Sequence, residues 1–187
     1  MRLTSGAPWV VALAALLVTG CAAPRIESPA VAAAQPTSAA SNPTFNPTDM
    51  AWIQLEIPLT ESVLALTDLA PTRTGNPSVL ALASKVAADQ RQQLAGLKGL
   101  LSEAGLPSTN VHEGHDMPGM VTASDLLIAQ QLNDGPFDKL FRKHLTDFLT
   151  QSLLVAKGEQ TSGANESTKR YAKDLSVARG ATLAGLK

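Results

Sequence analysis

The 187-residue sequence has no excess of charge of either sign, since 15 basic and 16 acidic residues give a formal net charge of -1. Proteins that bind nucleic acid through its phosphates usually carry a basic field, and a net charge near zero provides none. The chain is therefore not expected to bind nucleic acid. Any partner must be recognised through a specific site.

Sequence motifs that are typical of catalysis are also missing. The chain contains no Gly-x-Ser-x-Gly nucleophile turn, no glycine-rich phosphate loop and no Glu-x-x-His pair of the di-iron type. Among its few aromatic residues, Trp52 and Tyr171 stand alone at helical spacing, which packing explains adequately. We therefore expect a protein that is not an enzyme.

Cysteine is almost absent, and the single one, Cys21, lies in an informative place. The apolar run Trp9–Val18 is shorter than the roughly 20 residues of a membrane span and is typical of a signal-peptide core. The tetrapeptide Val18-Thr19-Gly20-Cys21 resembles the bacterial lipobox, where cleavage before the cysteine leaves its thiol carrying a diacylglyceryl group. The sequence thus predicts a signal peptide over residues 1–20 and a lipid anchor at Cys21.

A lipidated Cys21 has two consequences. It would hold the protein to a membrane of the bacterial cell envelope, outside the cytoplasm. It would also leave no thiol for a disulfide or a thiolate metal site.

Residues 22–44 contain little that could be buried in a core. They are nearly all Ala, Pro, Ser, Thr, Gln and Asn, so burial cannot offset the entropy lost on ordering them. We expect residues 21–44 to form the lipidated cysteine and a disordered tether. The folded domain should occupy residues 45–187.

Apolar residues recur at helical spacing through that domain, while Gly and Pro fall mostly at boundaries. Pro58 is an exception that should bend the helix around it. Good N-terminal capping residues precede several of the segments. The predicted helices are Thr48–Leu69, Pro77 to just before Gly105, Ala123–Leu132, Phe137–Lys157, and a last helix from Asn165 to the end of the chain.

A repeat indicates how these helices are assembled. The pentapeptide LAGLK occurs at residues 94–98 and again at 183–187, and the capping residues Asn76 and Asn165 precede the two copies by the same distance. Two related αα-hairpins packed as a four-helix bundle are the economical interpretation. The predicted fold class is all-α, with a short connector helix between the halves.

Several motifs occur in a set order along this domain: FNPTD at residues 45–49, NPSVLALASKVAADQ at 76–90, HDMPGM at 115–120 and FDKLF at 137–141. Together they resemble the DUF305 family of bacterial envelope proteins, and the likeness covers residues 45–187. The resemblance implies a duplicated, ferritin-like four-helix bundle, associated in some members with copper.

The metal-binding side chains implied by the family pattern are missing from the helices. The pattern places two His-His pairs in the bundle, and here Leu59-Thr60 and Phe148-Leu149 replace them. We therefore infer no metal site within the bundle. The interior around Leu59 and Phe148 should be apolar, dry and free of metal.

The family pattern also has a Gln-x-x-Glu motif in each half. It survives here as Gln90 with Gln93 and is replaced in the other half by Arg179 with Thr182. An inward Arg179 would need hydrogen-bond acceptors, which Gln90 or Gln93 could supply. We interpret this arrangement as structural.

The connector between the two halves keeps a set of soft ligands in "HEGHDMPGM". Imidazole and thioether both suit Cu(I), so His112, His115, Met117 and Met120 form a candidate copper site. The alternative is an ordinary polar loop rich in turn residues. The remaining histidine, His144, lies on an apolar helical stripe and is expected to be a core residue.

Two functional hypotheses remain open at this point. The first is a non-catalytic bundle with an accessory role, which binds another envelope protein or itself. The second is a copper-binding or copper-buffering protein that uses the connector. The lost histidine pairs favour the first, and the retained loop favours the second.

Overall fold

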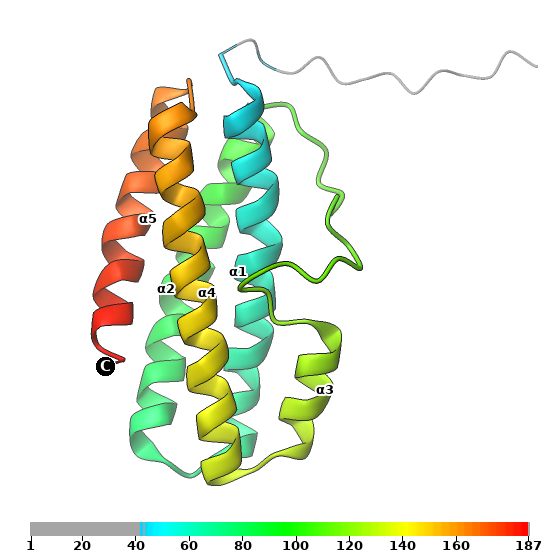
Figure 1. Ribbon diagram of the computed structural model, residues 1–187, viewed down its shortest axis with the longest axis vertical. Helices are drawn as coiled ribbons and strands as arrows, with labels where there is room; N and C mark the ends of the chain where they lie inside the picture. The colour runs from blue at the N-terminus through cyan, green and yellow to red at the C-terminus, as the bar shows by residue number, and fades with distance from the viewer. Residues whose placement is uncertain (1–41, 43, 187) are drawn as a thin grey trace, which may run out of the picture. The chain divides into compact units, whose positions relative to one another are not determined.

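The computed structural model describes residues 42 and 44–186. The predicted signal peptide, Cys21 and most of the tether lie outside the described residues. Within them the fold consists of helices and loops without any strand, as predicted (Figure 1). The helices are α1 (Pro47–Arg73), α2 (Pro77–Glu103), α3 (Ala123–Gln131), α4 (Asp134–Ser162) and α5 (Glu166–Ala184).

The four long helices stand side by side as a bundle, and the short α3 lies outside it (Figure 1). The two hairpins are α1 with α2 and α4 with α5, and they are joined mainly through α1 against α4. Helix α3 packs on α1 and α4. The connector therefore places α3 on the side of the bundle that these two helices form. None of the helices in residues 42 and 44–186 combines the length and apolar character needed to cross a bilayer.

Helix α1 is longer than predicted at its C-terminal end. It was expected to end at Leu69, but it continues to Arg73 because Ala70 is fully buried and extends the apolar stripe. At its start, Asn46 and Asp49 form a capping box that satisfies backbone N–H groups of the first turn. Pro58 lies within α1 as expected, while the bend it should cause stays a prediction.

Helix α4 extends beyond both predicted ends. Gly135 and Pro136, expected to precede it, lie in its first turn, where a proline costs no intrahelical hydrogen bond. At the other end it passes Lys157 and reaches Ser162, with Glu159 buried on its inner face. The predicted end at Lys157 was too early, because the buried carboxylate of Glu159 does not continue the apolar pattern of the helix.

The inward stripes differ from the predicted ones by a position or two. On α4, Leu145 is fully buried, whereas His144 is half-buried. On α5, Arg179 is buried and Ala178 is exposed, and the helix ends at Ala184 instead of the chain terminus. In both helices the buried stripe is shifted along the sequence relative to the predicted one.

The two halves of the bundle are related by an offset of 89 residues. Gln90 of α2 and Arg179 of α5 are separated by that number and hydrogen-bond to each other in the interior. Helices α1 and α4 end at Arg73 and Ser162, which have the same separation. The internal duplication inferred from the sequence therefore describes the folded bundle as well.

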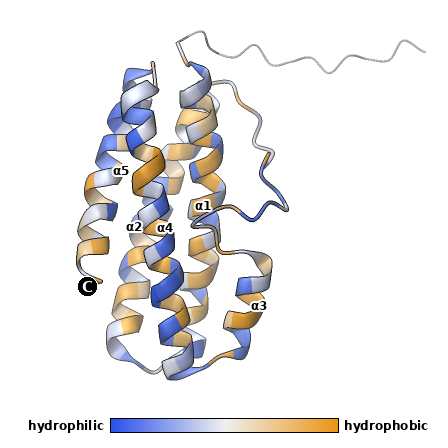
Figure 2. Ribbon diagram, in the orientation of Figure 1, coloured by the Kyte–Doolittle hydropathy of each residue, from blue (hydrophilic) through white to orange (hydrophobic). Residues whose placement is uncertain are grey.

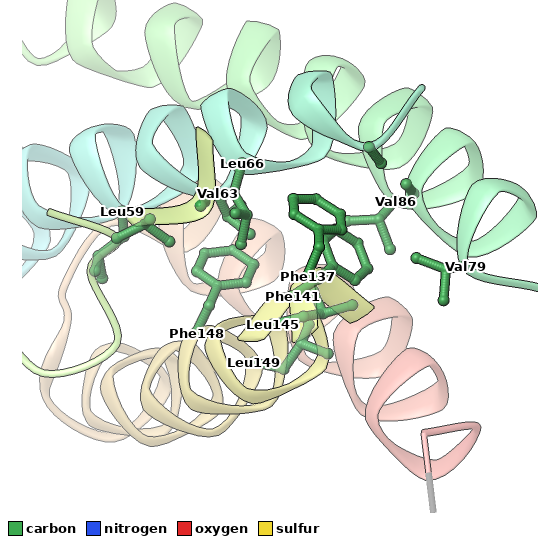
Figure 3. Packing of buried hydrophobic residues seen from close by; sticks show 14 residues of the cluster. Leu59, Val63, Leu66, Val79, Val86, Phe137, Phe141, Leu145, Phe148 and Leu149 are labelled. Atoms are coloured by element: carbon green, nitrogen blue, oxygen red, sulfur yellow. The ribbon is translucent and has the colours of Figure 1, made fainter. Parts of the chain in front are cut away.

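Two apolar clusters fill the interior. The first core cluster includes the side chains of Figure 3, where the aromatic rings of α4 point toward residues of α1 and α2. The second lies toward the other end and contains Trp52, Ile53 and Leu97. Hydrophilic and hydrophobic residues alternate along the long helices (Figure 2). Several of the buried positions are polar. The two clusters are separated by a set of buried polar side chains.

Candidate functional site

The central polar layer is the first candidate site. Each of the four long helices contributes at least one member at the level between the two core clusters. The members are Glu56 and Thr60 of α1, Gln90 and Gln93 of α2, Ser152 of α4 and Arg179 of α5. All except Gln93 are at least nine-tenths buried.

Arg179 is the centre of this layer, and each of its N–H groups has an acceptor. Its Nε donates to Gln93 Oε1 at 2.9 Å, and its Nη2 donates to Thr60 Oγ1 at 2.9 Å and to Gln90 Oε1 at 3.0 Å. Its Nη1 donates to Glu56 Oε2 and to Ser152 Oγ. A guanidinium has five N–H donors, so its hydrogen-bonding capacity is used in full.

Glu56 supplies the charge that makes burial of Arg179 tolerable. Its Oε2 lies 2.5 Å from Arg179 Nη1, and its other oxygen accepts from Ser152 Oγ at 2.9 Å. Phe148 adds a cation–π contact, since Arg179 Cζ lies 4.7 Å from the ring centroid. An isolated buried charge would be strongly unfavourable, so the layer is stable only as a complete set.

This arrangement does not suit a metal ion at the centre of the bundle. The carboxylate and amide oxygens that could coordinate one already accept from Arg179, and its fixed positive charge would repel a second cation. The copper chemistry implied by the family pattern therefore finds no matching ligand set between the helices. The guanidinium takes the place that such a cation would need.

The predictions for this region are partly confirmed. Arg179 is buried and donates to both proposed partners, Gln90 and Gln93. Leu59 and Phe148 lie fully buried in the first core cluster. The prediction of an apolar interior was wrong beside Phe148, where the guanidinium packs on the ring. Glu56 was missed, although its position between the apolar residues Ile53 and Leu59 of α1 was a signal that could have identified it.

The connector that joins α2 to α3 is the second candidate site. His115 N donates to His112 O at 3.1 Å, and Met120 N donates to Met117 O at 3.0 Å, so each pair of candidate ligands spans one turn. Gly114 and Gly119 have positive φ angles of 77° and 78°, which favour glycine. The backbone of the connector is thus folded into two successive tight turns.

The four connector residues differ in their surroundings. His115 is exposed, His112 and Met117 are half-buried, and Met120 packs against the first core cluster. Val121 N donates to Ser62 Oγ on α1 at 3.1 Å, which fastens this end of the connector to the bundle. Within residues 42 and 44–186, His, Cys, Asp and Glu side chains form no group of three suited to a metal ion.

His144 is more accessible than a core residue. Its side chain is 13% exposed, and its Nε2 lies 3.8 Å from Asp125 Oδ1 on α3. Asp125 in turn accepts hydrogen bonds from Thr122 in the capping box of α3. The expectation of a hydrogen-bonded core histidine was therefore too strong, because His144 borders the space between α3 and α4.

Two buried carboxyl groups lie close together at the end of the bundle where α1 begins. Asp49 accepts from the backbone N–H groups of Asn46, Ala164 and Asn165. Burial raises the pKa of the Asp49 carboxyl, but these bonds and the neighbouring Glu159 side chain together lower it. Burial, followed by the neighbouring Asp49 carboxylate, raises the pKa of Glu159 to about 8. Sequence reasoning missed this pair.

The fold and its central layer define a duplicated four-helix bundle, and the family model for DUF305, a domain of unknown function, matches residues 49–187. The chain belongs to the DUF305 family. No protein of curated function matches its sequence significantly. The family assignment made from the motifs is thereby confirmed.

Three solved structures have a similar fold. A DUF305 protein of Streptomyces coelicolor, described as a candidate secreted protein, has a TM-score of 0.67 and 18% identity over 74% of this chain and 88% of its own. A DUF305 fragment from Deinococcus radiodurans has a TM-score of 0.68 and 16% identity over 77% and 95%. CopM in a Cu(II)-bound form has a TM-score of 0.60 and 18% identity over 74% and 92%. At these identities the likeness shows the fold alone.

Proposed function

We propose that this protein is a lipid-anchored accessory protein of the bacterial cell envelope, and that its bundle acts by binding and not by catalysis. The observation that carries this proposal is the closed central layer, in which Arg179 uses every donor and Glu56 both oxygens. Helix bundles commonly place reactive metals and cofactors at this depth. Here the same space is occupied by a structural ion pair.

The surface offers a place for a partner. A groove of about 680 Å³ runs between α2 and α5, and its wall includes Leu82, Leu175 and Ala178. Tyr171 also lines the groove, and its hydroxyl donates to Gln93 O at 2.8 Å. A concave, largely apolar surface with a few polar groups is suited to binding another molecule.

The binding proposal can be tested in the native cells with a photoreactive amino acid at Ala178, which lines the groove. Irradiation should give one discrete cross-linked product that the same probe at Thr150, an exposed position on α4, does not give. A product of twice the mass of the chain would identify self-association, and another mass would identify an envelope partner. Identical products from both positions, or none from Ala178, would contradict the proposal.

The location of the protein is part of the proposal. The apolar run before Cys21 and the lipobox-like tetrapeptide support export and lipidation. The description of one structural relative as a candidate secreted protein agrees with a site outside the cytoplasm. Several acyl chains together hold a protein firmly at a membrane, whereas a single chain binds only weakly.

Replacing Cys21 by alanine should release the protein from the membrane fraction or leave its signal peptide uncleaved, because the acceptor thiol is lost. The measurement is fractionation of cells followed by mass determination of the protein. Cys21→Ser preserves the size of the side chain and should behave like Cys21→Ala. A variant that stayed firmly bound and was cut at the same place would exclude lipidation at this residue.

A second function, copper binding at the connector, is supported by one specific comparison. CopM, whose fold is similar, has been solved with Cu(II) bound. In the present chain the candidate ligands are confined to the connector, where His112, His115 and Met117 are at least partly accessible. Imidazole suits copper and zinc alike, whereas the soft thioether of methionine favours Cu(I) over Zn(II).

If the connector binds copper, changing His112, His115, Met117 and Met120 together to alanine should abolish Cu(I) binding in a competition titration against a chelator. Binding by the wild type should weaken in acid, because an imidazole must be neutral to coordinate a metal. His144→Ala is the matched control, since it removes a histidine outside the connector. Equal affinity of the wild type and the fourfold variant, or no binding by either, would identify the connector as an ordinary loop.

A further inference from the structure

Asp49 and Glu159 connect three parts of the chain that are far apart in the sequence. Asp49 lies in the first turn of α1, and Glu159 lies in the last turn of α4. The backbone of Ala164 and Asn165, in the turn between α4 and α5, donates to the Asp49 carboxylate at 3.1 and 3.0 Å. Both carboxyl groups are buried, with exposed fractions of 0% and 1%.

The two carboxyl groups have different hydrogen-bond partners. Asp49 is surrounded by N–H donors, which favour its charged form. The oxygens of Glu159 have no protein N–H or hydroxyl donor among the described residues, and the nearest polar partner is the Asp49 carboxyl. Two neighbouring buried carboxyl groups attract each other only if one of them holds a proton. A proton on Glu159 would let this side chain donate to Asp49.

Other charges around Glu159 are few. Among the described residues, Asp49 on α1 favours the protonated form of Glu159, and Lys169 on α5 is the cation that opposes it. The contribution of Lys169 is smaller than those of burial and Asp49. No charged group of α2 in the described part of the chain acts on Glu159.

The duplicated half of the bundle provides an internal comparison. Asp138 and Asn76 are the repeat equivalents of Asp49 and Asn165, and they are also joined, through Asn76 Nδ2 and Asp138 Oδ2 at 2.8 Å. The position equivalent to Glu159 is Ala70, so a second carboxyl is missing at that end. A single carboxylate, Asp138, is therefore sufficient to join a helix start to a turn in this bundle. We infer that Glu159 has a role beyond holding the α4–α5 turn.

We propose that Asp49 and Glu159 form a pH-sensitive clasp, which fastens the start of α1 to the α4–α5 turn while Glu159 is protonated and loosens as that proton is lost. The turn lies directly against the titrating group, since a Cβ on Gly163 would overlap the Glu159 carboxyl. Ionisation would place two negative charges side by side in a buried space. The repulsion would act on the hydrogen bonds to Ala164 and Asn165.

The direction of the pH effect follows from the raised pKa of Glu159. The folded clasp retains a proton up to about pH 8, whereas an exposed glutamate loses it near 4.5. Stability that depends on this proton is complete below pH 4.5, declines as the pH rises toward 8, and is absent above that value. The clasp is thus tightest in acid and weakest in alkali.

Amide hydrogen exchange of the full-length protein in detergent micelles tests this proposal. The protection factors of the Ala164 and Asn165 amides, corrected for the pH dependence of intrinsic exchange, should fall at least tenfold between pH 5.5 and 8.5. One proton linked to opening permits at most about tenfold per pH unit. In Glu159→Gln, whose amide can donate to Asp49 without titrating, protection should stay constant across this range.

Glu103→Gln is the matched control, because Glu103 lies in the last turn of α2 and is exposed. It should keep the pH dependence of the wild type. A carbon-13 titration of the Glu159 carboxyl should have its midpoint near pH 8, and a midpoint near 4.5 would overturn the proposal. An unchanged pH dependence in Glu159→Gln would do the same. Protection that is lost on adding a chelator at pH 6 would identify the pair as a cation site instead.

Discussion

Replacing Arg179 by alanine should destabilise the protein by about 3 to 5 kcal/mol, which is the cost of removing one partner from a buried ion pair. The remaining Glu56 carboxylate would be buried without a counter-charge, and four other acceptors would lose a donor. Denaturant unfolding of the wild type and the variant measures the difference. A loss below about 1 kcal/mol would mean that Arg179 does not bind at the centre of the bundle.

Two further measurements separate the charge effect from the loss of side-chain volume. The double variant Glu56→Leu with Arg179→Met removes both charges and should recover most of the lost stability, because apolar groups often replace buried ion pairs at little cost. Guanidinium ions at low concentration should partly stabilise Arg179→Ala while destabilising the wild type. If Arg179→Ala and the double variant were equally unstable, the loss of stability would come from packing and not from the unpaired charge.

Replacing Phe148 by alanine should cost about 3 to 5 kcal/mol of unfolding free energy through the cavity that it leaves. The ring is fully buried and points from α4 toward α1 (Figure 3). It also packs against the Arg179 guanidinium, whose Cζ lies 4.7 Å from the ring centroid. Loss of the ring therefore weakens the first core cluster and the central polar layer together. Denaturant unfolding at fixed pH gives the magnitude.

The matched control for Phe148 is Leu154→Ala on the same helix. Leu154 is 64% exposed, so its truncation should change the free energy of unfolding by less than about 0.5 kcal/mol. Similar losses in the two variants would show that the inward face of α4 has been assigned incorrectly. If Phe148→Ala were nearly as stable as the wild type, the inward face of α4 would also have been assigned incorrectly.

The architecture was predictable because local and repeated signals agree. Capping residues fixed the starts of α2 and α5, and the 89-residue offset related Gln90 to Arg179, which do meet in the interior. The ends of α1 and α4 were less predictable, because Pro71 and Glu159 interrupt the apolar pattern without ending the helix. Tertiary burial decided those boundaries.

The polar interior was predicted less completely than the fold. The repeat supplied the glutamine partners of Arg179, but it gave no reason to select Glu56, which lies 123 residues away and whose repeat equivalent is Leu145. Asp49 and Glu159 were missed for a similar reason, since a pair of like charges is not an expected contact. The candidate copper ligands of the connector and lipidation of Cys21 stay predictions.

The guanidinium at the centre of the bundle also determines how the folded state responds to its surroundings. A bound ion stabilises a protein in proportion to the logarithm of its free concentration, and a chelator can remove it. Arg179 is covalently part of the chain and keeps its charge at any pH a cell meets. The central layer therefore contributes the same stability in metal-starved and metal-rich surroundings.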